Sequence, residues 1–458
     1  MNMLKQLFGI TAPTIPQPAS PPPDATSTLE DELRDYSGYV RQAALERCAA
    51  LRRTDLLPDV VIRLNDWVSA VRHAARVTMQ YLMPLASPSA LLRILPAVLK
   101  LRDKSRSNHA NWLMQFEQQL ISLLSVRDFL DGLRGNDAKI ARSCFYMLHH
   151  HALSEPAHII RIALATRSDT VLATQAFQLC RAVVPSSQTD LYMAALASPF
   201  GRIRSGALLA LTRAPGAAGL RTLAQACLLD VQSSVRYLAI HYLKTQDIDA
   251  RAIYHAVLAD AASITQAMRV SLLALGSMHQ GHSGHDLAVI GRFTEAPLPS
   301  VRLAAFSAWF KLAPRDKDAI ALQAMVNVFP GVQKFGMQLV QRHGAFIPYA
   351  TLQALLEASG NHALLLSYAA LDKWHWLSTI ARLASLELPA WPGRLELRAQ
   401  LMLWTTRSNR YATRPQAQER AFLAKPATQA ILHELLADDH GEARQLLDFE
   451  LASHDLHG

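Results

Sequence analysis

The sequence predicts an all-α fold, a right-handed α-solenoid of about ten to eleven two-helix repeats followed by a helical C-terminal cap. Three observations lead to this prediction. Hydrophobic residues make up 50% of the 458 residues and only 19 are glycine, a balance that suits a helical protein. One amphipathic helical pattern recurs along most of the chain. Proline and glycine separate its copies.

The repeated pattern is clearest in residues 233–243. Val235, Ala239 and Tyr242 lie at offsets of 0, 4 and 7, which places them on one face of a helix. From residue 141 onward, copies follow one another at intervals of 31 to 33 residues. The wider gap between residues 72 and 141 leaves room for a faint copy near Trp112. The copies begin at Val40-Arg41, Val71-Arg72, Ile140-Ala141, Leu172-Ala173, Ile203-Arg204, Val235-Arg236, Met268-Arg269, Val301-Arg302 and Val332-Gln333.

A second helical run separates successive copies, so each repeat consists of two helices and two turns. Such a unit cannot bury its own apolar face, whereas stacked neighbours bury a continuous core. We therefore expect the repeats to stack in chain order. The predicted second runs include residues 89–101, 157–165, 219–229, 250–261, 287–293, 319–328 and 349–358.

The repeated residues resemble a known family. A turn with Asp or Asn, followed by V-R-x-x-A as in Val235-Arg236 and Ala239, is similar to HEAT repeats in the short form of the phycobilisome-lyase-like HEAT family. The match covers roughly residues 31–370. The resemblance implies a solenoid whose second helices line the concave side. It leaves the function open, because this fold serves many unrelated proteins.

Composition divides the chain into three parts. Residues 1–29 form a predicted flexible arm, because residues 11–29 are rich in Pro, Ser and Thr and cannot bury a core. The apolar segment Met1–Ile10 is either a frayed terminus or a docking peptide. Residues 30–370 form the predicted solenoid. In residues 371–458 the repeat fades, and we expect a C-terminal helical cap.

The arginine of the repeat has a predicted structural role. An aspartate stands six residues before the arginine in three copies. In HEAT-like repeats this pair resembles a ladder, in which the Asp caps the second helix and receives the Arg of a neighbouring repeat. We therefore expect these arginines to pair rather than to bind phosphates. The predicted ladder residues are Asp35, Arg41, Asp66, Arg72, Arg204, Asp230, Arg236, Arg269 and Arg302.

The face opposite the apolar stripe offers a candidate protein-binding surface. The position two residues after the first apolar residue points about 200° away from it. This position is polar in the early repeats and apolar in three consecutive later ones. The predicted partner-binding residues are Tyr237, Val270, Leu303 and Phe310. Either an external protein binds this strip, or tight curvature or the C-terminal segment covers it.

The densest basic region lies near the C-terminus. Its arginines are interleaved with aromatic residues, a combination that suits stacking on nucleic acid. The alternative is a solvated basic face that pairs with the acidic residues of the C-terminal end, such as Glu434 and Asp448. The predicted basic patch comprises Arg394, Arg398, Trp404, Arg407 and Arg410.

No motif for catalysis or for binding a nucleotide or cofactor occurs in the sequence, so we predict no catalytic residue and no cofactor. His149, His150 and His151 point about 100° apart on a helix and cannot all reach one ion. A second histidine group in residues 279–285 lacks the further ligands that a metal needs. We therefore predict no metal site.

These observations favour a non-catalytic scaffold or adaptor that presents a concave surface to a protein partner. The alternative is a nucleic-acid-binding solenoid, since the formal net charge is +9. A HEAT-like enzyme, similar to DNA glycosylases or lyases, stands third. The four cysteines form no CxxC pair and no apolar run is long enough for a membrane span, so we expect a cytoplasmic protein.

Overall fold

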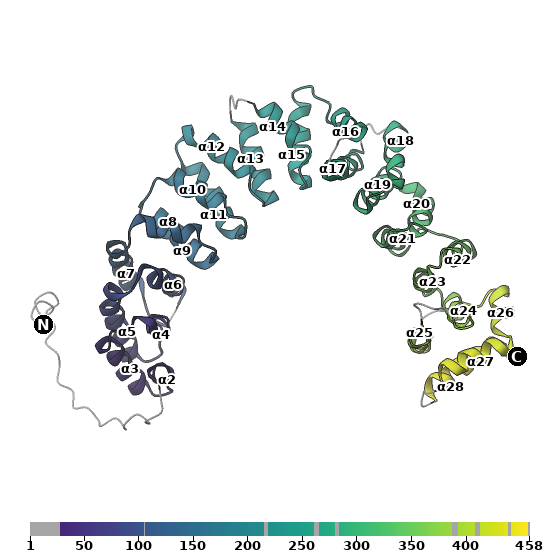
Figure 1. Cartoon of the computed structure of the whole chain (residues 1–458), viewed down its shortest axis with the longest axis horizontal. Helices are drawn as coiled ribbons and strands as arrows, with labels where there is room; N and C mark the ends of the chain where they lie inside the picture. The colour runs from purple at the N-terminus through teal and green to yellow at the C-terminus, as the bar shows by residue number, and fades with distance from the viewer. Residues whose placement is uncertain are drawn as a thin grey trace, which may run out of the picture. The chain divides into compact units, whose positions relative to one another are not determined.

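The computed structural model describes residues 28–104, 106–214, 219–260, 265–279, 284–386, 393–407, 413–437 and 441–456. These residues form helices and no strand, which confirms the predicted all-α fold class (Figure 1). The predicted N-terminal arm lies outside the described residues except for its last two, Thr28 and Leu29. The chain divides into two compact units. Unit 1 comprises Met1–Ala224 with Tyr237–Tyr242, and unit 2 comprises Gln225–Arg236 with Leu243–Gly458.

Unit 1 is a stack of helix pairs. Its helices are α2 (Leu29–Arg34), α3 (Gly38–Ala50), α4 (Leu57–Arg63), α5 (Ser69–Leu82), α6 (Pro88–Leu99), α7 (Ala110–Leu123), α8 (Val126–Arg134), α9 (Ala138–His150), α10 (Pro156–Leu164), α11 (Thr170–Leu179), α12 (Pro185–Leu196) and α13 (Gly201–Arg213). Short 3₁₀ turns are η1 (Thr54–Leu56), η2 (Met83–Leu85), η3 (Lys100–Asp103) and η4 (Cys180–Ala182). Helices α14 (Leu220–Cys227) and α15 (Ser233–Lys244) are divided between the two units.

Unit 2 continues the pairs and ends in a group of helices with a different pattern. Its helices are α16 (Ala250–Ala259), α17 (Thr265–Leu275), α18 (Gly284–Arg292), α19 (Pro299–Leu312), α20 (Lys317–Met325), α21 (Pro330–His343), α22 (Tyr349–Ala358), α23 (His362–Ala369), α24 (Lys373–Ala384), α25 (Arg394–Arg407), α26 (Ala417–Leu423), α27 (Pro426–Leu435) and α28 (Glu442–Ala452). Two 3₁₀ turns are η5 (Phe293–Glu295) and η6 (Pro314–Asp316).

The repeat spacing of the sequence is present in these helices. From α2 and α3 to α22 and α23, the described helices form eleven consecutive pairs. The predicted second runs agree with α6, α10, α14, α16, α18, α20 and α22 to within about three residues at each end. Proline occupies the first position of α10, α19 and α21, where its missing N–H costs no intrahelical hydrogen bond. The local signals of the sequence therefore located most helices correctly.

The layer in which the second helix of each pair lies changes once along unit 1. The second helices α3 and α5 pack against each other, and the first helices α4 and α6 pack against each other. The next neighbour of α6, however, is α9, a second helix, and α9 is followed by α11 and α13 (Figure 1). One layer of unit 1 therefore consists of α4 and α6, the first helices of their pairs, followed by α9, α11 and α13, the second helices of theirs. The expectation that all second helices line the same side is wrong for unit 1.

This change of layer coincides with the gap in the repeat pattern. The second helix α5 carries the small residue Ala75 in its buried face. Helix α7 has Trp112 and Phe116 in its buried face instead, with ring centroids 5.5 Å apart. Rings of this size keep a neighbouring helix farther away than alanine does. The missing copy of the pattern therefore marks a real interruption of the stack.

Helices α17 and α19 of unit 2 lie unusually close together. A Cβ atom placed on Gly276 would come within 2.6 Å of Cα and 2.8 Å of Cβ of Ala308. Only a glycine facing an alanine allows this approach. Helix α17 is buried on several sides, and its buried residues include Val270 and Ala274.

The C-terminal helices of unit 2 share one hydrophobic core. Its largest members are Trp374, Trp376 and Trp404, and Leu366 of α23 belongs to the same core. The indole Nε1–H of Trp404 donates to the carbonyl oxygen of Lys373 at 2.8 Å. The Lys373 ammonium in turn pairs with Glu450 of α28, 77 residues farther along the chain. Apolar packing thus joins helices α24 to α28 to the last repeat, and a buried ion pair joins α24 to α28.

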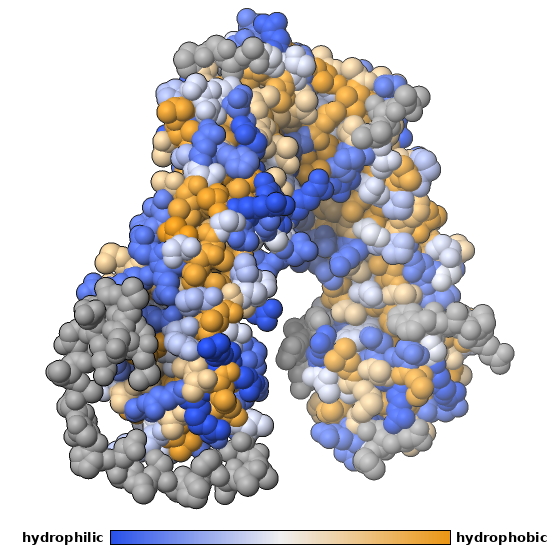
Figure 2. Space-filling model, turned by 60° about the vertical axis from the view of Figure 1, so that its left-hand side comes forward, coloured by the Kyte–Doolittle hydropathy of each residue, from blue (hydrophilic) through white to orange (hydrophobic). Residues whose placement is uncertain are grey.

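The outer surface mixes residue types. The face drawn in Figure 2 carries hydrophobic residues in patches with hydrophilic residues between them. Within the described ranges, no helix combines the length and the hydropathy needed to cross a lipid bilayer.

Candidate functional site

Arg41 and Asp66 form the best-defined rung of the predicted ladder. Arg41 Nε and Nη2 donate to Asp66 Oδ2 and Oδ1 at 2.9 and 2.8 Å, and both side chains are at most 2% exposed. The third nitrogen, Nη1, donates to the carbonyl oxygens of Asp35 and Tyr36, each at 2.7 Å. One arginine thus closes the turn of its own repeat and binds the turn of the next.

The contact within the turn recurs along the chain. In each case a side chain donates to the carbonyl oxygen six residues earlier, which fixes the turn before the second helix. The pairs are Arg72 to Asp66, Arg204 to Ser198, Arg236 to Asp230, Arg302 to Ala296 and Gln333 to Asn327. Arg269 of α17 is half-buried, and its Nε has no hydrogen-bond partner.

Contacts between repeats also recur. Arg142 of α9 donates to both carboxylate oxygens of Asp169 at 2.7 Å, and Arg302 of α19 donates to Asn327 Oδ1 at 3.2 Å. Arg142 and Asn327 were absent from the predicted ladder, because their repeats lack either the arginine or the aspartate at the usual place. The ladder therefore tolerates a shift in position and a neutral acceptor.

The predicted aspartates do not cap the second helices. The carboxylates of Asp35 and Asp66 accept from the N–H of Ser37 and Val68, at 2.6 and 3.0 Å. These two residues are themselves the caps of α3 and α5, so the carboxylate shapes the turn in front of the helix. Asp230 accepts from the Gln232 N–H at 2.7 Å in the same way.

The Asp66 carboxylate is the most strongly held of these groups. Burial raises the pKa of Asp66, but hydrogen bonds from Arg41 and the Val68 N–H outweigh this and keep the pKa below its ordinary value. Arg63 adds a third contact at 3.0 Å. The rung is therefore occupied by a charged pair that water does not reach.

The predicted apolar strip is not a continuous exposed surface. Tyr237 is 69% exposed, but Val270 of α17 is 1% exposed. Leu303 and Phe310 are half-buried and pack against the core of α19 to α23. Phe310 lies against Phe335 of the next repeat, with ring centroids 6.5 Å apart. Three of the four residues are thus covered, and the cover comes from neighbouring repeats rather than from the C-terminal segment.

The aromatic residue of the predicted nucleic-acid patch is not accessible in the structure. Trp404 is 1% exposed and lies in the C-terminal core, so its ring cannot stack on a base. Arg394 forms an ion pair with Glu434, which matches the predicted pairing with the acidic end. On α25, Arg398 is half-buried and Arg407 is exposed. Arg410 lies outside the described residues.

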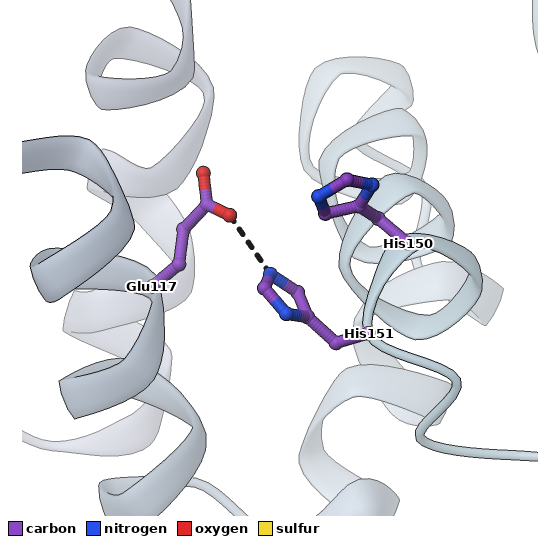
Figure 3. A group of neighbouring side chains, drawn as sticks. All are labelled: Glu117, His150 and His151. Atoms are coloured by element: carbon purple, nitrogen blue, oxygen red, sulfur yellow. Dashed lines mark hydrogen bonds and ion pairs between the residues drawn. The ribbon is translucent and has the colours of Figure 1, made fainter. Parts of the chain in front are cut away.

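A histidine and carboxylate cluster lies where the stack of unit 1 changes layer. His151 Nε2 is 2.8 Å from Glu117 Oε2, and His150 lies beside this pair (Figure 3). One potential ligand atom from each of the three residues lies within 4.8 Å of the others. Of the three consecutive histidines, His150 and His151 belong to this cluster and His149 does not, since α9 ends between His150 and His151.

The Glu117 cluster already has a cation of its own. Arg102 of η3 forms an ion pair with the other oxygen of Glu117 and a hydrogen bond with the hydroxyl of Tyr146. Its guanidinium carbon lies 4.0 Å from the centre of the Tyr146 ring. These contacts join α7 to α9 across the change of layer. We interpret the cluster as a structural contact.

The cysteines are poorly placed for nucleophilic chemistry. Burial raises the pKa of the thiols of Cys48 and Cys180 to about 11 and that of Cys144 to about 12. These thiols stay protonated at neutral pH. Cys227 is half-buried.

Two aromatic residues at the turns of the first repeats are unusually exposed. Tyr36 is 87% and Trp67 61% exposed, and their ring centroids lie 6.0 Å apart in an edge-to-face arrangement. The ladder fixes the backbone of both residues, because Arg41 donates to Tyr36 O at 2.7 Å and Arg72 to Trp67 O at 3.1 Å. The sequence does carry a signal for this pair, since each residue directly follows a ladder aspartate.

Comparison with known proteins gives fold-level likenesses only. No protein-family model matches the chain, and no curated protein matches it. Importin beta, solved in an ammonium sulfate condition, shares 12% identity over 93% of this chain with a TM-score of 0.29. The chain spans 58% of the length of that importin beta chain.

Two further structures are similar in the same limited way. A chain from a study of the phosphorylation switch between cadherin and beta-catenin shares 14% identity, with a TM-score of 0.21, and covers 93% of this chain and 100% of its own. A chain from work on tubulin recruitment by microtubule polymerases with TOG domain arrays shares 13% identity, with a TM-score of 0.20, and covers 89% and 99%. All three neighbours are solenoids of the HEAT or armadillo type, the class that the sequence resembles. The functions named for them are theirs, and the fold of this chain rests on its own helices.

Proposed function

We propose that this chain is a non-catalytic scaffold that binds a protein partner through aromatic side chains at the turns of its first repeats. The observation that carries the proposal is the exposed pair of Tyr36 and Trp67. Tyrosine and tryptophan dominate the residues that contribute most to protein-protein affinity. Covering such rings with a partner surface removes apolar area from water, which favours binding.

The setting of the pair also suits recognition. Arg41 and Arg72 hold the two turns through hydrogen bonds to backbone carbonyls, so little backbone entropy is lost when a partner binds. Tyr39, another exposed aromatic residue, lies three residues after Tyr36, in the first turn of α3. The chain carries a formal net charge of +9, which favours a partner with an acidic surface.

Affinity purification of the full chain, followed by quantitative mass spectrometry, tests the proposal. The double variant Tyr36→Ser with Trp67→Ser removes both rings, including the Trp67 ring 5.7 Å from the Arg41 guanidinium, and keeps the arginines that hydrogen-bond to the two turns. We expect the double variant to lose a co-purifying protein that the wild type retains, with unchanged helical circular dichroism.

Tyr237→Ser is the matched control, because it also removes an exposed aromatic ring from a repeat helix. A partner that is lost only with this control would move the binding surface to Tyr237. An unchanged set of co-purifying proteins in the double variant would contradict the proposal.

A further inference from the structure

A second cluster of metal-binding side chain types lies among the C-terminal helices of unit 2. Asp372, His375 and Glu419 each offer one ligand atom, and these atoms lie within 4.8 Å of one another. Asp372 and His375 are three residues apart at the start of α24, so both lie on one face of that helix. Glu419 comes from α26, 44 residues after His375.

Each of the three side chains is held in place by its surroundings. Asp372 caps α24, where its Oδ1 accepts from the N–H groups of Trp374 and His375 at 2.9 and 3.2 Å. Glu419 Oε2 accepts from the Gln416 N–H at 2.7 Å, which caps α26. The His375 ring stacks on Tyr349 with centroids 4.0 Å apart. Metal ligands need such contacts to keep their orientation.

The charges at this cluster differ from those at Glu117. In the described part of the chain, neither Asp372 nor Glu419 forms an ion pair with a lysine or arginine, and the partner of Glu419 is His375. Lys373, next to Asp372 in the sequence, is paired with Glu450. The charges of two carboxylates together balance that of one divalent cation.

A cavity of about 630 Å³ adjoins the cluster and is lined by all three residues. Arg382 and Phe422 also line it, and the Arg382 guanidinium lies 5.3 Å from the centre of the Phe422 ring. The hydroxyl of Ser378, another lining residue, is buried and has no hydrogen-bond partner. An ion held by three protein ligands keeps free coordination positions, and the cavity leaves room for water or a small ligand there.

We propose that Asp372, His375 and Glu419 bind one divalent transition-metal ion and that this ion joins α26 to α24. One imidazole nitrogen and two carboxylate oxygens suit Zn²⁺ or Mn²⁺. In the absence of the ion, the contact between His375 and Glu419 holds the two helices together. The bound ion replaces the contact between His375 and Glu419 and brings the Asp372 carboxylate into the junction between α24 and α26.

Calorimetric titration of the metal-free full chain with Zn²⁺ and, separately, with Mn²⁺ tests this site. We expect one bound ion per chain, together with slower amide hydrogen exchange in α26. Asp372→Asn is the sharpest variant, since asparagine caps a helix as well as aspartate does but lacks the charge. Glu419→Gln removes the second charge from the other helix. Each should weaken binding by at least about tenfold.

His150→Ala is the matched control, because it removes a ligand type from the other cluster at an exposed position. We expect it to leave the affinity unchanged. Circular dichroism without metal shows which of the two ligand variants keeps the wild-type fold, and that variant decides the comparison. No binding of either ion by the wild type, or binding that survives the folded ligand variant, overturns the proposal. Loss of binding in His150→Ala alone assigns the ion to the Glu117 cluster and also overturns it.

Discussion

The Arg41–Asp66 rung of unit 1 and the Arg302–Asn327 rung of unit 2 have the same layout but a different charge. In both, the arginine donates to the carbonyl oxygen six residues earlier and to a side chain 25 residues later. In both, that side chain also accepts from the N–H two residues on, Val68 or Phe329. The layout therefore depends on an oxygen acceptor in the turn and does not require a carboxylate.

What the carboxylate adds is a second short bond and a charge out of reach of water. Asp66 receives Arg41 through both oxygens, at 2.9 and 2.8 Å, whereas Asn327 receives Arg302 through one oxygen at 3.2 Å. A buried ion pair is costly to break, because the remaining partner keeps an unpaired charge. The two rungs should therefore respond differently to substitution and to pH.

The largest effect is expected from Arg41→Ala. This change leaves Asp66 buried with only the contacts to Arg63 and to the Val68 N–H, and we expect the free energy of unfolding to fall by about 3–5 kcal/mol. Chemical denaturation measures the loss, and hydrogen exchange should locate it in α3 and α5. Arg53→Ala is the control, since the Arg53–Asp55 pair is exposed and contributes little to stability. Equal losses for the two variants would contradict a special role for the buried rung.

The second-largest effect is expected from acid, which should weaken the charged rungs. Hydrogen bonds hold the pKa of Asp66 and of Asp169 below the ordinary value of about 3.9, with Arg142 as the largest cause for Asp169. Because folding lowers the pKa of both carboxyl groups, their contribution to the free energy of unfolding is fully present above the ordinary pKa. This contribution is lost as the pH falls through the pKa of the folded state. Protection factors measured between pH 5 and pH 3 should fall near Asp66 and stay constant near Asn327. Asp66→Asn should flatten the response, and an unchanged slope in that variant would refute this assignment.

A smaller loss is expected from Arg302→Ala. The change removes the Arg302 donor from two turn carbonyls and from the Asn327 carboxamide, which keeps the Phe329 N–H, and no charge remains behind. We expect a decrease of about 1–3 kcal/mol in the free energy of unfolding, measured under the same conditions as for Arg41→Ala. A loss as large as that of Arg41→Ala would show that charge does not separate the two rungs.

The smallest effect is expected from Asn327→Asp, which gives unit 2 a charged rung. A hydrogen bond to a charged acceptor is worth about 1 kcal/mol more than one to a neutral acceptor, so a gain of that size is expected at neutral pH. The gain should disappear below about pH 4, where the new carboxylate is protonated. Thermal unfolding at pH 7 and pH 3 measures both, and a destabilised protein at pH 7 would show that this turn cannot accommodate the charge.

The sequence predicted those features that depend on short-range patterns. Apolar spacing and junction prolines placed the helices, and the ladder arginines were recognised because the pattern repeats. The change of layer at α6 was not predicted, because it depends on how α7 packs with Trp112 and Phe116. The burial of Val270 was not predicted for a similar reason. The angle around one helix does not show that Gly276 lets α19 approach it.

The histidine and carboxylate clusters were missed because their members are distant in the sequence. Glu117 lies 34 residues before His151, and Glu419 lies 44 residues after His375. No local motif joins such residues, so only the packing of α7 on α9, or of α26 on α24, brings them together. The Asp372-x-x-His375 spacing was the one signal available, and it is too common to indicate a site without Glu419.

The tryptophans of the C-terminal core give the protein an optical reporter of its own. Trp374, Trp376 and Trp404 are buried together, whereas Trp67 in unit 1 is exposed. The emission of an indole moves to longer wavelength when water reaches it. Opening of the C-terminal helices should therefore shift the fluorescence to the red, while loosening of the first repeats leaves the signal of Trp67 nearly unchanged. Opening of the C-terminal helices can therefore be followed by colour, without any attached dye.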